Sequence, residues 1–285
     1  MIVDEFLGPV RQHLDAQAPH LRPLFDVMAG EARFARSWLD DDLRGLPEAA
    51  PILEVGGGAF LLSYELAREG FAITAVEPTG VGFGALEELG DMVLALAARD
   101  GVVPKVVRCK AEEFRSDALF EFAFSVNVME HIEAPDVAIE RVSASLTPGG
   151  SYRFLCPNYL FPYEPHFNIP TFGSKGLTER LFRRRIQADT KTADPIGLWK
   201  SLNWITVPQV RRIAAADASL AIAFQRRTLA SMLERAVGDV EFAKRRAPWM
   251  VTAIKVLRTT RLLRLAALVP VTCQPLMDVR LTKLH

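Results

Sequence analysis

The sequence has few cysteines, few histidines and no excess of charge of either sign. Its 285 residues include three cysteines and five histidines, and lysine plus arginine equal aspartate plus glutamate at 34 each. Cys109, Cys156 and Cys273 lie far apart with no C-x-x-C pair, which fits neither a disulfide framework nor a zinc site and favours a reducing compartment. The balanced charge gives no support for a nucleic-acid partner.

Long apolar runs are also absent. No uncharged apolar stretch has the length needed to cross a bilayer. The first residues include Asp4 and Glu5 in place of the apolar core of a signal peptide. We therefore expect a cytoplasmic protein, and the chain is long enough to bury a substantial core.

The middle of the chain alternates between two patterns. Short apolar runs alternate with amphipathic stretches that end in Gly70, Gly101 or the Pro148–Gly150 segment. Strands are expected at 51–55, 71–76, 105–109, 121–128 and 151–157, and helices at 59–69, 83–99 and 134–146. This alternation indicates βαβ units, and hence an α/β fold with a parallel sheet covered on both faces.

The two ends of the chain differ from this middle part. Residues 4–45 have helical periodicity, Thr206 is a candidate N-cap of a helix, and strands are expected at 220–225 and 277–284. We therefore predict an N-terminal helical segment at 1–48 and one α/β domain at 49–285. Within that domain we expect a substrate-loop insertion at about 158–203 and a helical cap at about 227–270.

Three consecutive glycines stand between the first expected strand and the helix that follows. Glycine adopts positive φ without steric cost and lets a ligand approach the backbone, so Gly56, Gly57 and Gly58 suit a tight binding turn. The start of the following helix offers free N–H groups. Glu77 ends the next strand about twenty residues later, where a carboxylate can accept both hydroxyls of a ribose. The pattern predicts a nucleotide-type ligand.

Two common nucleotide sites do not fit this turn. A phosphate-binding P-loop needs Lys-Ser or Lys-Thr after its last glycine, and no such pair is present. A dinucleotide fingerprint that begins at Gly56 and Gly58 needs glycine or alanine at position 61, where this chain has Leu61.

The remaining pattern resembles the class I S-adenosylmethionine-dependent methyltransferases. Glu54, Gly56 and Gly58 match their first motif, E-x-G-x-G-x-G, with Phe60 in place of the last glycine. "FEFAFSVNVMEHI" at 120–132 resembles the fourth-strand motif, "LTPGG" at 146–150 the turn before strand five, and "WIT" at 204–206 a landmark of the small-molecule, ubiquinone-pathway-like branch. The resemblance covers roughly residues 45–225 and implies a doubly wound, mostly parallel seven-stranded sheet, with N-terminal helices and helical insertions around it.

The resemblance also assigns the cofactor residues. Glu54 and the turn Gly56–Gly58 are expected to hold the methionine end of S-adenosylmethionine, and Glu77 its ribose. The family usually places an acid for the adenine amino group where this chain has Lys110, which leaves the backbone of Ala111 and the side chain of Glu112 as the nearest candidates. Asn127 is expected to line the cofactor cleft. For Glu54 and Glu112 an alternative is open, namely a helix cap and a solvated loop acid.

Candidates for the chemistry lie after the fourth and fifth expected strands. Open α/β sheets bind ligands at the carboxyl ends of their strands, so His131 and His166 are the candidate proton acceptors. Three prolines between 162 and 170 stiffen the loop that carries His166. The candidate substrate residues in that loop are Tyr159, Tyr163 and Glu164. In the alternative, His131 caps the next helix and His166 is packed in the loop.

The sequence thus predicts an enzyme that transfers a methyl group from S-adenosylmethionine to a small-molecule or glycan- or lipid-linked acceptor, with oxygen as the accepting atom by resemblance. The departures at Phe60 and Lys110 also permit a non-catalytic cofactor-binding or scaffold protein. We expect no metal and no nucleic-acid partner, and the sequence makes no prediction of oligomeric state.

A basic segment near the end of the chain has two interpretations. Residues 242–277 contain seven basic residues and no acid, beside many leucines and valines, a composition that suits a membrane surface. However, Lys255, Arg258, Arg261 and Arg264 repeat every three residues, and this spacing drifts around an α-helix of 3.6 residues per turn. We therefore favour a helical cap and leave contact with a membrane surface as the alternative.

Overall fold

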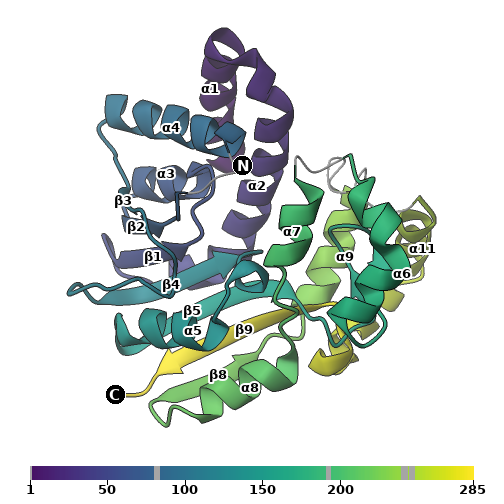
Figure 1. Ribbon diagram of the computed structural model, residues 1–285. Coiled ribbons are helices and arrows are strands. Elements are labelled where there is room, and N and C mark those ends of the chain that lie inside the picture. Colours follow the sequence, from purple (N-terminus) through teal and green to yellow (C-terminus); the bar gives the residue numbers. More distant parts are fainter. Residues whose placement is uncertain (1, 80–83, 191–193, 239–242, 244–247) are drawn as a thin grey trace. The chain divides into compact units, whose positions relative to one another are not determined.

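The computed structural model describes residues 2–79, 84–190, 194–238, 243 and 248–285 (Figure 1). Seven strands form one sheet in the order β3-β2-β1-β4-β5-β9-β8. The strands of the parallel part are β1 (Pro51–Val55), β2 (Ala72–Val76), β3 (Lys105–Val107), β4 (Phe120–Val126) and β5 (Leu146–Pro157). β8 (Leu220–Phe224) and β9 (Leu276–Lys283) pair antiparallel. The predicted doubly wound, mostly parallel seven-stranded α/β fold is confirmed.

The strand register explains why the glycine turn and Glu77 come together. β1 pairs in parallel with β2, and Val55 is the partner of Val76. The next residues of the two strands, Gly56 and Glu77, therefore leave the sheet at the same edge, where the carboxyl ends of parallel strands meet. The backbone N–H of Gly56 still bonds to the carbonyl of Val76 at 2.7 Å, so the turn begins directly at the strand end.

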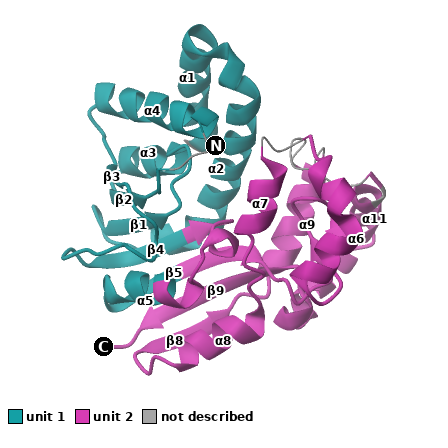
Figure 2. Ribbon diagram, viewed as in Figure 1, with its two compact units in different colours: residues 1–124, 138–152 teal, residues 125–137, 153–285 magenta. Residues whose placement is uncertain are grey.

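The chain divides into two compact units, residues 1–124 with 138–152 and residues 125–137 with 153–285 (Figure 2). In the first unit, α1 (Ile2–Gln17) and α2 (Arg22–Arg44) share a hydrophobic core with α3 (Leu61–Arg68) and α4 (Gly84–Arg99). Phe6, Leu14 and Phe25 are buried in this core beside Phe60 and Tyr64. The N-terminal helices thus pack as part of the first unit, and α5 (Pro135–Ala144) begins in the second unit and ends in the first.

The second unit contains the inserted elements. Its helices are η2 (Met129–His131), α6 (Lys175–Gln187), α7 (Pro195–Ser201), α8 (Val207–Ala215), α9 (Thr228–Gly238), α11 (Pro248–Thr259), η3 (Leu262–Leu268) and η4 (Val271–Cys273). Thr206 caps α8, as predicted, by accepting the N–H of Gln209. Among the described residues, no helix has both the length and the apolar character needed to cross a membrane.

Some element boundaries differ from the sequence-based expectation. The segment 158–170 was predicted as a loop, yet β6 (Tyr163–Glu164) and β7 (Ile169–Pro170) form a small antiparallel hairpin within it. β5 begins at Leu146, five residues before the predicted start, so the Pro148–Gly150 segment that was expected to end a helix belongs to the strand. Residue 83, predicted to start a helix, and parts of the predicted insertion and cap (191–193, 239–242 and 244–247) lie outside the described residues.

Candidate functional site

The glycine turn and Glu77 form one hydrogen-bonded unit. The N–H of Gly58 donates to Glu77 Oε2 at 2.9 Å. Gly56 and Gly58 have φ of 82° and 52°, a backbone region that favours glycine. At Gly57 a Cβ atom would lie 2.8 Å from the ring of Phe60 and 3.2 Å from the Cβ of Ala75. Each glycine of the turn is therefore required, two by conformation and one by space.

Phe60 stands where the family's motif has its last glycine, and the structure shows how the change is accommodated. Its φ is +56°, the left-handed conformation that a glycine would adopt without strain. The ring is buried against Gly57 and Gly90, and the guanidinium of Arg108 lies 4.9 Å from its centroid. Burial of the ring and the cation–π contact offset the cost of this backbone conformation.

Two carboxyl groups lie at this turn, that of Glu54, which is buried, and that of Glu77, which is partly buried. Burial raises the pKa of Glu54 to about 8, although the hydroxyl of Ser63 donates to its carboxylate, and Glu77 raises the pKa further. Burial also raises the pKa of Glu77, while the N–H of Gly58 and the charge of Arg108 act in the opposite direction. An apolar turn with two carboxyl groups suits a ligand that brings hydroxyl groups and a positive charge.

The other predicted cofactor residues lie in different places. Ala111 is buried in a turn after β3, with its carbonyl bonded to the N–H of Phe114 at 3.3 Å. Glu112, the other candidate for the adenine, follows Ala111 in the same turn, and the N–H of Lys110 donates to the side chain of Glu113 at 3.4 Å. Asn127 follows β4 in the second unit, has φ +56° and donates its N–H to the carbonyl of Leu155 at 2.8 Å.

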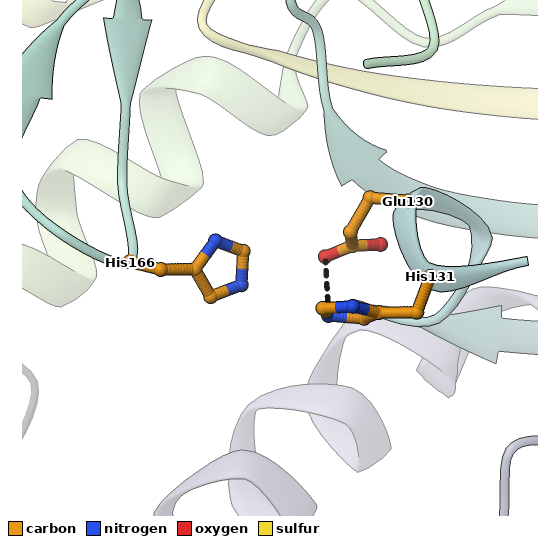
Figure 3. Close-up of side chains that lie close together, drawn as sticks. All are labelled: Glu130, His131 and His166. Atoms are coloured by element: carbon orange, nitrogen blue, oxygen red, sulfur yellow. Dashed lines mark ion pairs between the residues drawn. The ribbon is translucent and has the colours of Figure 1, made fainter. Parts of the chain in front are cut away.

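In the second unit, three titratable side chains gather around one point (Figure 3). Glu130 and His131 come from η2, and His166 comes from the turn between β6 and β7. One ligand atom of each lies within 4.8 Å of the others. The two imidazole rings meet edge to face with centroids 5.4 Å apart, and His131 Nε2 lies 4.0 Å from Glu130 Oε1. The structure therefore brings together the two histidines that the sequence could only place separately.

Glu164 fixes the orientation of His166. Its side chain is completely buried, and Oε1 lies 2.6 Å from His166 Nδ1. The same carboxylate accepts the backbone N–H groups of His166 and Phe167 and the hydroxyl of Tyr159. With Nδ1 bound to the carboxylate, His166 Nε2 points toward Glu130 and His131 (Figure 3). Tyr163, by contrast, donates its hydroxyl to Asn168 at 2.6 Å and so closes the hairpin.

Burial controls the protonation of this cluster. Burial, reinforced by His166, lowers the pKa of His131 to about 4, so this imidazole is neutral at pH 7. Its Nδ1 lies 2.9 Å from the hydroxyl of Ser201, the last residue of α7. Burial raises the pKa of Glu130 to about 7. The cluster thus holds a buried carboxyl group that titrates near neutrality beside a neutral imidazole.

Sequence reasoning did not single out Glu130, and two side chains of this region carry unsatisfied polar atoms. Both carboxylate oxygens of Glu130 are buried without a hydrogen-bond partner among the described residues. Trp204 has φ +61°, and its indole N–H is likewise buried without a partner. Its ring stacks on Tyr159, with centroids 5.0 Å apart. Unsatisfied buried polar groups and strained backbone are typical of binding sites, but only coordinates reveal them.

The sequence profile of the "Methyltransferase domain" family matches residues 30–236. This chain belongs to the methyltransferase domain family. The match includes the glycine turn, Glu77 and the histidine cluster. The order of the sheet strands, with β8 and β9 antiparallel at one edge, is the class I methyltransferase arrangement.

Two relatives, one of high and one of low sequence identity, support the assignment to this family. An uncharacterized protein of Mycobacterium tuberculosis is 60% identical over 281 residues, a match that covers 99% of this chain and 95% of the relative. A ubiquinone biosynthesis O-methyltransferase of Rickettsia conorii is 28% identical over 141 residues, or 50% of this chain and 42% of that enzyme. The chain thus matches less than half the length of the ubiquinone enzyme.

Among solved structures, the phosphoethanolamine N-methyltransferase 2 of Haemonchus contortus, in complex with S-adenosylhomocysteine and phosphomonomethylethanolamine, has a TM-score of 0.52 at 13% identity. The alignment covers 96% of this chain and 59% of that protein. The plantazolicin methyltransferase, in complex with a substrate analog and S-adenosylhomocysteine, has a TM-score of 0.50 at 10% identity. That alignment covers 99% of this chain and 98% of the plantazolicin enzyme. At these identities the likeness establishes the fold.

Proposed function

We propose that this protein transfers the methyl group of S-adenosylmethionine to a hydroxyl group of a small-molecule or glycan- or lipid-linked acceptor. The observation that carries the proposal is the pair His166–Glu164, in which a buried carboxylate lies 2.6 Å from Nδ1 of an imidazole that is 24% exposed. A carboxylate in this position fixes the ring and its tautomer and leaves Nε2 able to accept a proton.

The first unit supports the cofactor part of the proposal. Glu77 accepts from Gly58 through one oxygen, and a carboxylate has further lone pairs that can accept ribose hydroxyls. Glu54, whose pKa is raised to about 8 by burial, gains a compensating charge when a cationic methionine end binds nearby. Relatives in complex with S-adenosylhomocysteine share this fold, which is consistent with the same cofactor here.

In the proposed reaction, the acceptor oxygen forms a bond to the methyl carbon while the bond from that carbon to sulfur breaks. S-adenosylhomocysteine leaves, and the hydroxyl proton passes to Nε2 of His166. The imidazolium that forms is stabilised by the carboxylate of Glu164. His166 is a better acceptor than His131, because a pKa of about 4 makes His131 a weak base at pH 7.

A divalent cation is a second candidate for the same cluster. The ligand atoms of Glu130, His131 and His166 lie within 4.8 Å of one another, and the carboxylate of Glu130 has no hydrogen-bond partner in the part of the chain that the structure describes. Glu164 would orient His166 as a carboxylate orients a metal-bound histidine. Glu130, His131 and His166 would then hold the cation, which would supply Lewis-acid chemistry to an acceptor hydroxyl, and His166 would be a ligand instead of a base.

The deciding experiment measures transfer of a radiolabelled methyl group from S-adenosylmethionine to a panel of diphenols, hydroxylated glycosides and glycolipids. In the presence of EDTA, the proposal expects undiminished transfer by the wild type and a loss of about 10²–10⁴-fold in His166→Ala. Loss of activity with EDTA, restored by Mg²⁺ or Mn²⁺, would assign the cluster to a cation.

The transfer assay needs a control variant and a separate measurement of cofactor binding. Tyr163→Phe removes a hydroxyl from the same hairpin without touching the cluster, so its activity should stay close to wild type. Calorimetry with S-adenosylmethionine should give equal affinities for wild type and His166→Ala. Binding of the cofactor without transfer to any acceptor in the panel would favour a cofactor-binding or scaffold role.

A further inference from the structure

The basic segment near the end of the chain does not form one continuous α-helix. α11 ends at Thr259, Arg261 has a left-handed φ of 59°, and the chain continues as the 3-10 helix η3 from Leu262 to Leu268. A 3-10 helix has 3.0 residues per turn, so side chains three positions apart lie in line along it. Within η3, side chains that repeat every three residues therefore stay on one side of the helix and do not drift around it.

The leucines of η3 separate into an inner and an outer row. Leu263 and Ala266 are buried, at 5% and 9% exposure, on the side where η3 contacts α9 and α11. The outer row is Leu262, Leu265 and Leu268, with exposures of 47%, 53% and 72%. Val256 and Leu257 of α11 are also exposed. A contiguous apolar row of this kind on a helix surface is unusual unless something covers it.

The charged residues of α11 and η3 are all of one sign, since the sequence has no acid from 242 to 277. Lys255, Arg258 and Arg261 are exposed, and none of them forms an ion pair with another residue of the described chain. An acid, Glu234, is exposed on the neighbouring helix α9. Exposed leucines on a segment whose own charges are all positive are complementary to a lipid surface, which offers acyl chains to the leucines and negative headgroups to the cations.

We propose that α11 and η3 dock the protein on the surface of an anionic phospholipid bilayer, with the outer leucine row in the acyl-chain boundary and the three cations at the headgroups. The row belongs to a short 3-10 helix, so it lies in the interface and does not span the bilayer. The proposal does not depend on the methyl-transfer chemistry, because none of these residues belongs to the histidine cluster or the glycine turn.

Flotation of the full-length protein with vesicles tests the proposal. Vesicles of phosphatidylcholine with phosphatidylglycerol should carry the wild type at least tenfold better than vesicles of phosphatidylcholine alone, and high salt should reduce the difference. Arg258→Gln with Arg261→Gln should weaken binding to anionic vesicles by about 30-fold, since each cation near the surface contributes about fivefold. Leu265→Ser with Leu268→Ser should weaken it by at least tenfold.

Matched variants elsewhere on the surface serve as controls. Leu119→Ser replaces a leucine that is 47% exposed, and Lys105→Gln with Arg212→Gln removes two exposed cations outside α11 and η3. These variants should float like the wild type, and circular dichroism should show that every variant is folded. Absence of flotation with anionic vesicles, or equal flotation of all variants, overturns the proposal. A dimer in sedimentation that the leucine variants abolish, without vesicle binding, would assign the row to a second copy instead.

Discussion

Gly58 donates its backbone N–H to Glu77 Oε2 at 2.9 Å, although the two residues lie 19 positions apart in the chain. The bond joins the end of β2 to the turn after β1, so the ribose-binding candidate also stabilises the turn. A substitution of Glu77 therefore removes two things, a charged acceptor for a ligand and an acceptor for the protein's own backbone. The two contributions can be separated by the choice of substitution.

Glu77→Ala should weaken the binding of S-adenosylmethionine by about ten- to a hundred-fold, because it removes charge-assisted hydrogen bonds that contribute about 1.5–3 kcal/mol. Glu77→Gln keeps an oxygen for the N–H of Gly58 and should lose less. Isothermal titration calorimetry measures both, with Asp117→Ala, an exposed acid, as the control. Unchanged affinity in a folded Glu77→Ala variant would remove Glu77 from the cofactor site.

The fold was readily predicted from the sequence because its signals are local. The segment 51–55 is a short apolar run bounded by a proline and three glycines, and β1 has these bounds. Thr206 caps its helix as expected, since an N-cap depends on residues within one turn. The hairpin at 163–170 was missed, because two strands of two residues each are too short to show an alternating pattern.

The candidate site was only partly predictable, for a different reason. His131 and His166 could be named from their positions after strands, yet their ring centroids lie 5.4 Å apart through tertiary packing across 35 residues of chain. Glu164 was predicted as a substrate residue, and the bonds that it accepts from its own hairpin are visible only in the structure. The importance of Glu130 depends on its complete burial, which no local sequence signal reports.

Glu54 makes the stability of the free protein depend on pH. Burial raises its pKa from the ordinary 4.5 to about 8. Between these values the native protein holds a proton that the unfolded chain has released, so the free energy of unfolding falls as pH rises, by about 1.4 kcal/mol per pH unit for this group. Glu54→Gln keeps an acceptor for Ser63 but cannot titrate, so this part of the slope should disappear.

Urea denaturation between pH 5.5 and 7.5 measures that slope in both proteins. Other buried acids contribute equally to wild type and variant, so the difference between the two slopes isolates Glu54. Glu48→Gln, which removes an exposed acid, should leave the wild-type slope unchanged. Parallel slopes for wild type and Glu54→Gln would show that this carboxyl group is already ionised across the range.

Glu164 should act on catalysis through His166. Glu164→Gln removes the negative charge that stabilises a protonated imidazole, so turnover should fall by about 10- to 100-fold with little change in KM for S-adenosylmethionine. The acid limb of the pH–rate profile should also move to lower pH, an effect that a purely structural role would not produce. Tyr159→Phe, which removes a donor at 3.3 Å and no charge, is the control. A fall in turnover without a shift of the profile would leave Glu164 as a structural residue of the hairpin.

A buried ion pair holds the second unit together, and its loss should be costly. Arg153 of β5 donates to both carboxylate oxygens of Asp278 of β9, at 2.9 and 2.6 Å, and the hydroxyl of Thr228 donates to the same carboxylate. The side chain of Asp278 is completely buried and that of Arg153 is 11% exposed. Asp278→Asn leaves a buried guanidinium without its counter-charge, and the free energy of unfolding should fall by about 3–5 kcal/mol.

The comparison with an exposed pair tests whether burial is the cause of this cost. Arg33 and Asp4 also form an arginine–aspartate bridge, at 2.6 Å, but their side chains are 48% and 64% exposed. Asp4→Asn should therefore lower the free energy of unfolding by no more than about 1 kcal/mol, because solvent screens the charges.

The double variant Arg153→Met with Asp278→Leu removes both buried charges and should recover most of the stability that Asp278→Asn loses, since no charge is left uncompensated. Urea denaturation at pH 7 ranks the three variants. Equal losses for Asp278→Asn and Asp4→Asn would show that the buried guanidinium finds another partner, and that β5 and β9 are held together by their backbone bonds and apolar contacts alone.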